Sequence, residues 1–300
     1  MKRYVSAVLC CLVMGVATHA RAADTIKFKF LNAVYLDVKG APLYSPEGVV
    51  CAGKSSVVVA DSGNGRLVKY QLTNDELKDG IEIKAAQISY PIRVAANTKG
   101  ELFVLDGKTR KVVRLAADGT FLGYLDPQNV PEPSAFVARS LATDKGDNLY
   151  LLDILGERVL ILDPAGKFLR QIPFPKGYGF FSDLNVDQRG NILVLDSVKG
   201  EVIKAAKDAA AFQTLATGLQ AYLYFSVSIE TDNQGRIFLL DQNDNAVILL
   251  GQDGSFQGRY LGMGWKGGQL YYPSQACVTE SGDFVIADRN NNRLQLFKIQ

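Results

Sequence analysis

Histidine is almost absent from this chain, since a single residue in 300, His19, lies near the N-terminus. Around it, Lys2 and Arg3 are followed by a short apolar stretch, and small residues precede Ala23, which is the pattern of a secretion signal. We therefore expect residues 1–22 to be a signal peptide and the protein to be exported, periplasmic or secreted. A mature chain without histidine cannot build a Ser-His-Asp triad, a histidine-ligated zinc site or an imidazole acid–base pair.

The sequence also lacks a long apolar run and an excess of basic residues. After residue 22 no apolar stretch approaches the roughly 20 residues of a transmembrane helix, so no membrane span is expected in the mature chain. Removing residues 1–22 leaves 30 of the 33 Lys and Arg residues against 31 Asp and Glu residues, a net charge of about −1. Without a basic run we expect no nucleic-acid partner.

What the chain does contain is a repeat. An apolar run ending in Asp occurs six times, at intervals of 45, 47, 43, 45 and 47 residues. The six residues are Asp61, Asp106, Asp153, Asp196, Asp241 and Asp288. Between them, short apolar segments alternate with Gly and Asp-Gly turns, and no helical period is present. This pattern predicts an all-β fold, a six-bladed β-propeller of four-stranded antiparallel blades.

The two ends of the chain indicate how the ring closes. The last repeat has only three strands, up to Gln300, whereas the alternating segment Ile26–Phe30 has no partner nearby. Because an unpaired edge strand invites aggregation, we expect this N-terminal strand to complete the last blade as its outermost strand. The predicted organisation is a signal peptide over 1–22, a closing strand and linker over 23–45, and the propeller over 46–300, with the last two forming one domain.

Three segments carry a family resemblance: SPEGVV, VVVADSGNGRLVKY and FVIADRNNNRLQLF. Their pattern of Pro-x-Gly, an apolar run ending in Asp, and Asn-x-Arg resembles the NHL-repeat family of six-bladed propellers, from Pro46 to Gln300. Blades four and five depart from it, with Glu201 and Ala246 near the place of the Arg. Functions in that family range from protein and RNA binding to lyase chemistry, so the resemblance implies the fold and does not name the function.

The repeated Asp residues could suggest catalysis or calcium binding. They occupy the same place in all six blades, however, where a carboxylate can accept hydrogen bonds from the amides of the following turn. One active site rarely needs six equivalent acids, so we predict a structural role for them.

Function is expected where the repeats differ. Alignment on the Asp residues places the start of each innermost strand around one mouth of the central channel. There Arg93 and Arg139 lie on neighbouring blades, and Glu47 and Asp183 lie on the blades that flank them. Either these groups form two salt bridges that neutralise the mouth, or the arginines form a polar floor that binds a carboxylate.

The loops that lead into these strands are rich in aromatic residues. Some are expected to pack between blades. The Gly-rich stretch GRYLGMGWKGGQLYYPS, which holds the sole Trp, is poor core material and is typical of a recognition loop. We therefore add Tyr178, Trp265, Tyr271 and Tyr272 to the candidate binding residues.

Two cysteines remain after residue 22, Cys51 in the first blade and Cys277 in the last. Their positions in the innermost strands differ by one, so their side chains have opposite parity. Neighbouring blades present opposite faces to their junction, so both thiols face it or both face away. In an oxidising compartment a disulfide across the closure and two buried free thiols both remain possible. Neither cysteine lies in a CxxC motif, so a redox-active pair is not expected.

These observations favour a non-catalytic binding or scaffold protein. It would recognise a protein, peptide or carboxylated ligand on one face of the channel, with a partner in the cell envelope and without a cofactor. The alternative resembles calcium-dependent lactonase or lyase propellers, in which Glu47 and Asp183 would contribute ligands. Arg, Ser and Val at the equivalent positions leave too few oxygens for the six to eight that calcium takes, so this alternative is less favoured.

Overall fold

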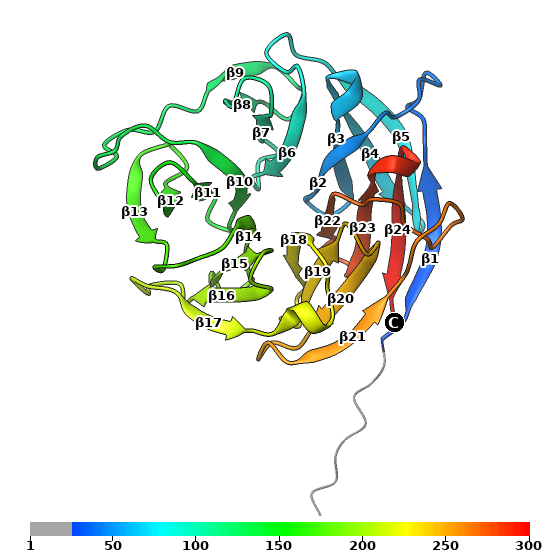
Figure 1. Cartoon of the computed structure of the whole chain (residues 1–300). Coiled ribbons are helices and arrows are strands. Elements are labelled where there is room, and N and C mark those ends of the chain that lie inside the picture. Colours follow the sequence, from blue (N-terminus) through cyan, green and yellow to red (C-terminus); the bar gives the residue numbers. More distant parts are fainter. Residues whose placement is uncertain (1–25) are drawn as a thin grey trace, which may run out of the picture.

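The computed structural model describes residues 26–300, so the predicted signal peptide lies outside the described residues. Six four-stranded antiparallel sheets stand in a ring around a central axis (Figure 1). The prediction of a six-bladed propeller is confirmed. Between residues 26 and 300 no helix has the length and apolar character needed to cross a membrane.

The strands of each blade follow one another from the axis outward, except that the last blade takes its outermost strand from the N-terminus. Blade 1 contains β2 (Pro46–Ala52), β3 (Ser56–Asp61), β4 (Arg66–Thr73) and β5 (Glu76–Ile83). Blade 2 contains β6 (Pro91–Ala96), β7 (Leu102–Asp106), β8 (Val112–Leu115) and β9 (Phe121–Tyr124). Blade 3 contains β10 (Ala138–Thr143), β11 (Leu149–Asp153), β12 (Arg158–Leu162) and β13 (Phe168–Pro173).

Blade 4 contains β14 (Phe181–Val186), β15 (Ile192–Asp196), β16 (Glu201–Ala205) and β17 (Gln213–Ala216). Blade 5 contains β18 (Ser226–Thr231), β19 (Ile237–Asp241), β20 (Ala246–Leu250) and β21 (Phe256–Tyr260). Blade 6 contains β22 (Gln275–Val278), β23 (Asp283–Asp288), β24 (Arg293–Ile299) and β1 (Phe28–Val34). Single 3₁₀ turns occur at η1 (Ser62–Asn64), η2 (Leu219–Ala221) and η3 (Arg289–Asn291).

The second strand of each blade explains the repeated apolar runs. Strands β7, β11, β15 and β19 are buried along their whole length. Neighbouring blades cover both of their faces, so these strands read as continuous apolar segments rather than alternating ones. An apolar layer fills each of the six junctions between blades, and these layers are the core of the molecule.

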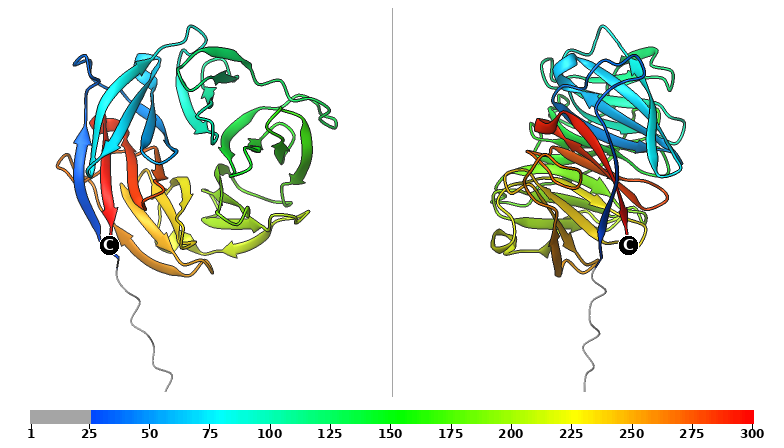
Figure 2. Two further views of the ribbon diagram at one scale, coloured as in Figure 1. Left: turned by 180° about the vertical axis from the view of Figure 1, so that it is seen from behind. Right: turned by 90° about the vertical axis from the view of Figure 1, so that its right-hand side faces the viewer.

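Ring closure follows the prediction from the sequence. Strand β1 pairs antiparallel with β24, with Phe28 opposite Ile299, and forms the outer edge of blade 6 (Figure 2). The strand extends to Val34, further than the predicted segment, because pairing continues past a bulge between Phe30 and Asn32. The Phe28 ring packs among other aromatic rings, which are those of Phe238, Tyr260, Phe284 and Phe297.

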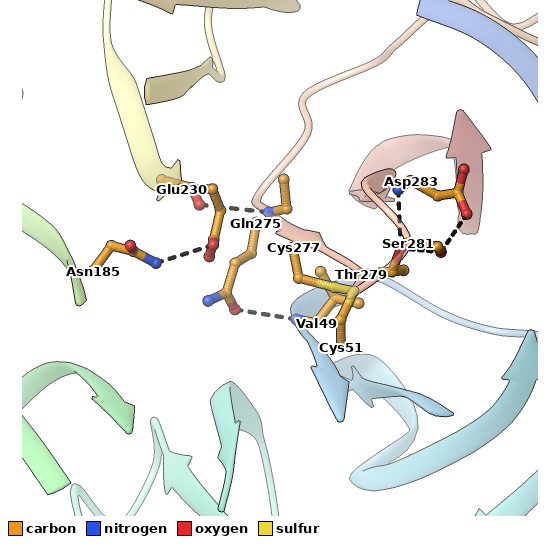
Figure 3. Close-up of a disulfide and its surroundings, with 11 residues drawn as sticks. Val49, Cys51, Asn185, Glu230, Gln275, Cys277, Thr279, Ser281 and Asp283 are labelled. Carbon is orange, nitrogen blue, oxygen red and sulfur yellow. Dashed lines mark hydrogen bonds between the residues drawn. A yellow bond between two sulfur atoms is a disulfide. The ribbon is translucent and has the colours of Figure 1, made fainter. Parts of the chain in front are cut away.

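A covalent link closes the ring on its inner side. Cys51 in β2 and Cys277 in β22 form a disulfide, with an S–S distance of 1.99 Å and Cα atoms 5.7 Å apart (Figure 3). Of the two states that the sequence left open, the structure has the disulfide. Blades 1 and 6 are thus joined through the disulfide near the axis and through the β1–β24 ladder at the periphery.

Candidate functional site

The two ends of the channel differ in the segments that form them. We call the top face the end at which the innermost strands begin; strand pairing is antiparallel, so the turns after the second strands lie there as well. It comprises the loops 35–45, 84–90, 125–137, 174–180, 217–225 and 261–274 and the turns 62–65, 107–111, 154–157, 197–200, 242–245 and 289–292. The bottom face comprises the turns after the first strands, 53–55, 97–101, 144–148, 187–191, 232–236 and 279–282, and the turns after the third strands, 74–75, 116–120, 163–167, 206–212 and 251–255.

The six repeated Asp residues position the top face. Asp196 accepts hydrogen bonds from the amides of Gly179 at 2.6 Å and Phe180 at 2.9 Å in the preceding loop, and from Lys199 at 3.0 Å in the following turn. The equivalent carboxylates are buried and bind loop amides in the same way. At Asp106 burial opposes ionisation, but its amide partners outweigh this effect and lower its pKa. The structural role predicted for these residues agrees with this geometry, and they also hold the loops.

Arg93 lies across the axis. Its Nη1 donates to the carbonyl of Ile92 at 2.9 Å, and its Nη2 reaches the carbonyl of Val227 at 3.3 Å, in the blade opposite. Its Nε is buried and has no hydrogen-bond partner. Within residues 26–300 the Arg93 guanidinium forms no salt bridge with a carboxylate, although its charge acts on the carboxyl of Asp183.

Asp183 lies in the same part of the molecule but bridges two other blades. It is buried, and it accepts hydrogen bonds from the hydroxyl of Ser140 and from the amide of Ile229, the latter at 3.0 Å. Burial raises the pKa of Asp183, although the charge of Arg93 and these two hydrogen bonds oppose the shift. Its oxygens therefore link the inner strands of blades 3, 4 and 5 and are not free to bind a ligand.

Arg139 also lacks an acidic partner in the described part of the chain. Its guanidinium carbon lies 4.1 Å from the centre of the Phe180 ring, and its Nη1 donates to the Phe181 carbonyl at 3.0 Å. Burial lowers the pKa of Arg139; the Tyr178 phenol opposes this shift, and the charge of nearby Arg110 adds to it.

The salt bridges considered from the sequence are not the ones that form. Glu47 pairs with Arg289 at 3.1 Å, measured from Nε to Oε1, and accepts a hydrogen bond from the Tyr90 hydroxyl at 3.1 Å. Arg93 and Arg139 both remain without a carboxylate. Alignment gave the position of each residue around the ring but not the direction of its side chain, so this pairing was wrong. Binding of a carboxylate by the two arginines stays a prediction.

The predicted binding residues share the top face but form two groups. Arg93, Arg139 and Tyr178 lie on blades 2 to 4, whereas Glu47 lies on blade 1 and the remaining aromatic residues lie on the loop into blade 6. In that loop Tyr272 lies near Arg289, whose guanidinium carbon is 5.9 Å from the ring centre.

Trp265 belongs to the periphery of the second group. It is 71% exposed, and its carbonyl accepts a hydrogen bond from Arg293, which also binds the Tyr35 hydroxyl. Tyr271 lies beside it, with ring centres 6.3 Å apart. Because Arg293 binds both Tyr35 and the Trp265 carbonyl, the loop lies toward the outer strands of blade 6, away from Arg93 and Arg139.

Sequence reasoning missed several residues of the top face. Leu155 and Val198 are exposed although they are large and apolar, and each stands two positions after a repeated Asp. An apolar residue within a polar turn was the signal that could have revealed them. Arg110 and Arg289 occupy equivalent turns, 107–111 and 289–292, and were missed as well.

A further carboxyl group, that of Glu230, lies on the inner strand β18, one residue before the bottom-face end of the strand. Asn185 of the neighbouring blade donates to it at 3.0 Å, and both side chains are seen in Figure 3. Burial and the charge of Asp183 raise the pKa of Glu230 well above its ordinary value. Across residues 26–300 no group of three or more His, Cys, Asp or Glu side chains could hold a metal ion. Glu47 and Asp183, the calcium ligands considered from the sequence, lie on opposite blades and do not meet.

The bottom face holds a cavity of about 600 Å³. Its polar lining is largely engaged in local turns, since Asp144 accepts the amide of Gly146 at 2.8 Å and Asp187 accepts that of Arg189 at 2.9 Å. These turns bind their own backbone, which leaves few polar atoms for a ligand.

Residues 270–297 match the family model for the NHL repeat. The match covers the end of the loop into blade 6 and most of its three C-terminal strands, and it confirms the resemblance drawn from the sequence. No curated protein matches the chain.

Solved structures similar to this propeller have varied functions. Virginiamycin B lyase from Staphylococcus aureus is 10% identical, with a TM-score of 0.60, over 92% of this chain and 88% of that one. A gluconolactonase from Xanthomonas campestris is 13% identical, with a TM-score of 0.65, over 92% and 95%. A chain of a nidogen–laminin complex is 17% identical, with a TM-score of 0.59, over 79% and 88%. At these identities the likeness establishes the fold alone.

Proposed function

We propose that this protein is an exported, non-catalytic propeller that binds a protein or peptide partner on its top face. The observation that carries the proposal is the distribution of exposed apolar side chains. On the top face Tyr224 is 78% exposed, Trp265 71%, Val198 60% and Tyr44 58%. In the described residues, none of the exposed large apolar side chains lies in the bottom-face turns.

The spread of these residues favours a macromolecule over a small ligand. Together with Leu155 on blade 3, they lie on loops and turns of blades 3, 4, 5, 6 and 1, so they surround the axis rather than line one pocket. Exposed apolar groups rimmed by polar residues are typical of protein interaction surfaces. Tyr, Trp and Arg side chains, which are frequent on this face, are also those that contribute most to such interfaces.

Two observations support export. Residues 1–22 have the pattern of a secretion signal. The Cys51–Cys277 disulfide is a bond that persists in oxidising compartments and is rare in the cytosol. We place the protein in the periplasm or outside the cell, with its partner in the cell envelope.

The similar enzymes do not favour a lyase or lactonase reaction here. A structure of virginiamycin B lyase in which a histidine is replaced by alanine is described as catalytically inactive, and it is 12% identical to this chain. This chain has no histidine after His19. Among the described carboxylates of the top face, Glu47 is engaged with Arg289, Glu157 with Tyr178 and Asp196 with backbone amides.

The test is affinity capture from the envelope fraction of the source organism. The bait is the mature protein, compared with a top-face double variant, Val198→Ser with Tyr224→Ser, and a bottom-face control, Lys145→Ser with Gln188→Ser. All four residues are exposed, so each double variant should melt like the wild type. We expect one partner to be retained by the wild type and the control and to be lost with the top-face variant. Capture by no form, or equal loss in the control, would overturn the proposal.

A further inference from the structure

A sector of the top face on blades 2 and 3 carries three arginines, Arg93, Arg110 and Arg139, whose guanidinium groups form no salt bridge within residues 26–300. Arg93 and Arg139 pair with no carboxylate, and Arg110 lies close enough to Arg139 to lower its pKa. Arg110 is exposed, and within residues 26–300 its side chain makes no hydrogen bond or ion pair. Glu157 of the same sector is engaged by the Tyr178 hydroxyl at 3.0 Å. Asp183, on whose carboxyl the charge of Arg93 acts, is buried and bound by Ser140 and Ile229.

The backbone shows that two charged residues of this sector are not required by the fold. In the turn after the second strand of each blade, the residue four positions after the repeated Asp has a positive φ. These residues are Gly65, Arg110, Glu157, Gly200, Asn245 and Asn292. Glycine and asparagine tolerate this left-handed conformation, whereas other side chains strain it. Four blades have the tolerant residue. Blades 2 and 3 instead have Arg110 at φ 61° and Glu157 at φ 48°.

Departures from a local rule at one place in a repeated structure point to function. Here the strained Arg110, the unpaired Arg139 and the buried, unpartnered Nε of Arg93 all lie in the same sector. Guanidinium groups bind carboxylates through paired N–H donors, and a nearby aromatic ring such as that of Phe180 keeps the Arg139 guanidinium in place.

We propose that this basic sector, formed by Arg93, Arg110 and Arg139, binds the carboxylates of an acidic segment of the protein partner. The proposal rests on the proposed function and specifies the chemistry of the partner at this sector. Asp or Glu side chains would meet Arg110 and Arg139 at the rim and Arg93 at the axis. Exposed apolar residues on blades 3 and 4, Leu155 and Val198, would contact the flanking residues of the segment.

The probe is a fluorescein-labelled peptide, Gly-Glu-Glu-Phe-Glu-Glu-Gly, with its Glu-to-Gln counterpart as the matched control. Binding is measured by fluorescence anisotropy at low salt and at physiological salt. We expect the acidic peptide to bind and the Gln peptide not to bind. Arg139→Gln and Arg110→Gly should each weaken binding at least about tenfold, since each removes charge-assisted hydrogen bonds. Lys145→Gln, which removes an exposed charge from the bottom face, should leave it unchanged.

Arg110→Gly separates recognition from folding. Because glycine relieves the left-handed backbone, this variant should melt at the same temperature as the wild type or higher while it binds more weakly. No binding of the acidic peptide, unchanged binding in both arginine variants, or equal loss with Lys145→Gln would overturn the proposal. Displacement of the peptide by inorganic phosphate at a concentration at which acetate has no effect would show a phosphate site and would also overturn it.

Failure of this proposal can be told from failure of the proposed function. If the envelope partner is captured through Val198 and Tyr224 but binds the Arg110 and Arg139 variants as it binds the wild type, the top face is the binding face and the acidic segment is wrong. If no partner is captured at all, the proposed function itself fails.

Discussion

The disulfide between Cys51 and Cys277 should contribute a large share of the stability of the ring. Its two ends are 226 residues apart in the sequence, and a cross-link of that span restricts the unfolded chain enough to stabilise the fold by about 5 kcal/mol in the chain-entropy view. Cys51→Ala with Cys277→Ala should therefore lower the free energy of unfolding by up to about that amount. The fold should persist, because the β1–β24 ladder still closes the ring.

Guanidinium unfolding followed by circular dichroism measures the effect. Oxidised wild type, wild type with a phosphine reductant and the double variant are compared, since reduction breaks the bond without removing side-chain volume. We expect the reduced wild type and the double variant to unfold at similar midpoints, both well below that of the oxidised protein. Equal midpoints for all three forms, or two alkylated thiols in unreduced, unfolded protein, would refute the reasoning.

Two further results are expected. Phe28→Ala should lower the free energy of unfolding by about 3 kcal/mol, because it empties a site among four aromatic rings. Phe30→Ala removes a side chain that touches one ring and should cost less than half as much. Equal losses in denaturant unfolding would contradict this account of ring closure. Glu230→Gln should make stability less dependent on pH, because the folded-state pKa of Glu230 is raised, so the wild type loses stability as the pH rises through it. The variant should then melt higher than the wild type at pH 8 and similarly near pH 4, and a difference that does not vary with pH would count against the raised pKa.

The fold could be predicted because its signals are repeated and local. Each Asp that ends a second strand, such as Asp196, accepts a hydrogen bond from an amide of the preceding loop in all six blades, so one pattern was seen six times. The closing strand was recognisable because an alternating segment at one end matched a missing strand at the other.

The site was predicted less well because ring position does not determine side-chain direction. The inner strands begin with a register shift, as between Pro91 and Arg93, so adjacent residues there do not simply alternate. Glu47 consequently meets Arg289 rather than an arginine of a neighbouring inner strand. Trp265 shares the top face with the two arginines but lies apart from them, because Arg293 binds its loop toward the outer strands.

Glu230 escaped notice because it lies deeper along the axis than the aligned positions. Its raised pKa reflects burial and the charge of Asp183 in the neighbouring blade, and its hydrogen-bond donor, Asn185, belongs to that blade as well. Such contacts between blades follow from the stacking of whole sheets, and no spacing within one repeat reveals them.

The buried Asp residues that hold the top-face loops have a consequence for how this surface can change. Asp196 binds Gly179 and Phe180 through their backbone amides, and Asp241 binds Tyr224 and Phe225 in the same way. An amide is common to every residue except proline, so the side chains of these loops can be exchanged while the loop path is kept. The binding specificity of the top face can therefore change through mutation, or be redesigned, one loop at a time while the propeller stays the same. A library of substitutions confined to the exposed positions of 174–180 and 217–225, with the core residues Leu219 and Leu223 kept, would sample new partners at little risk to folding.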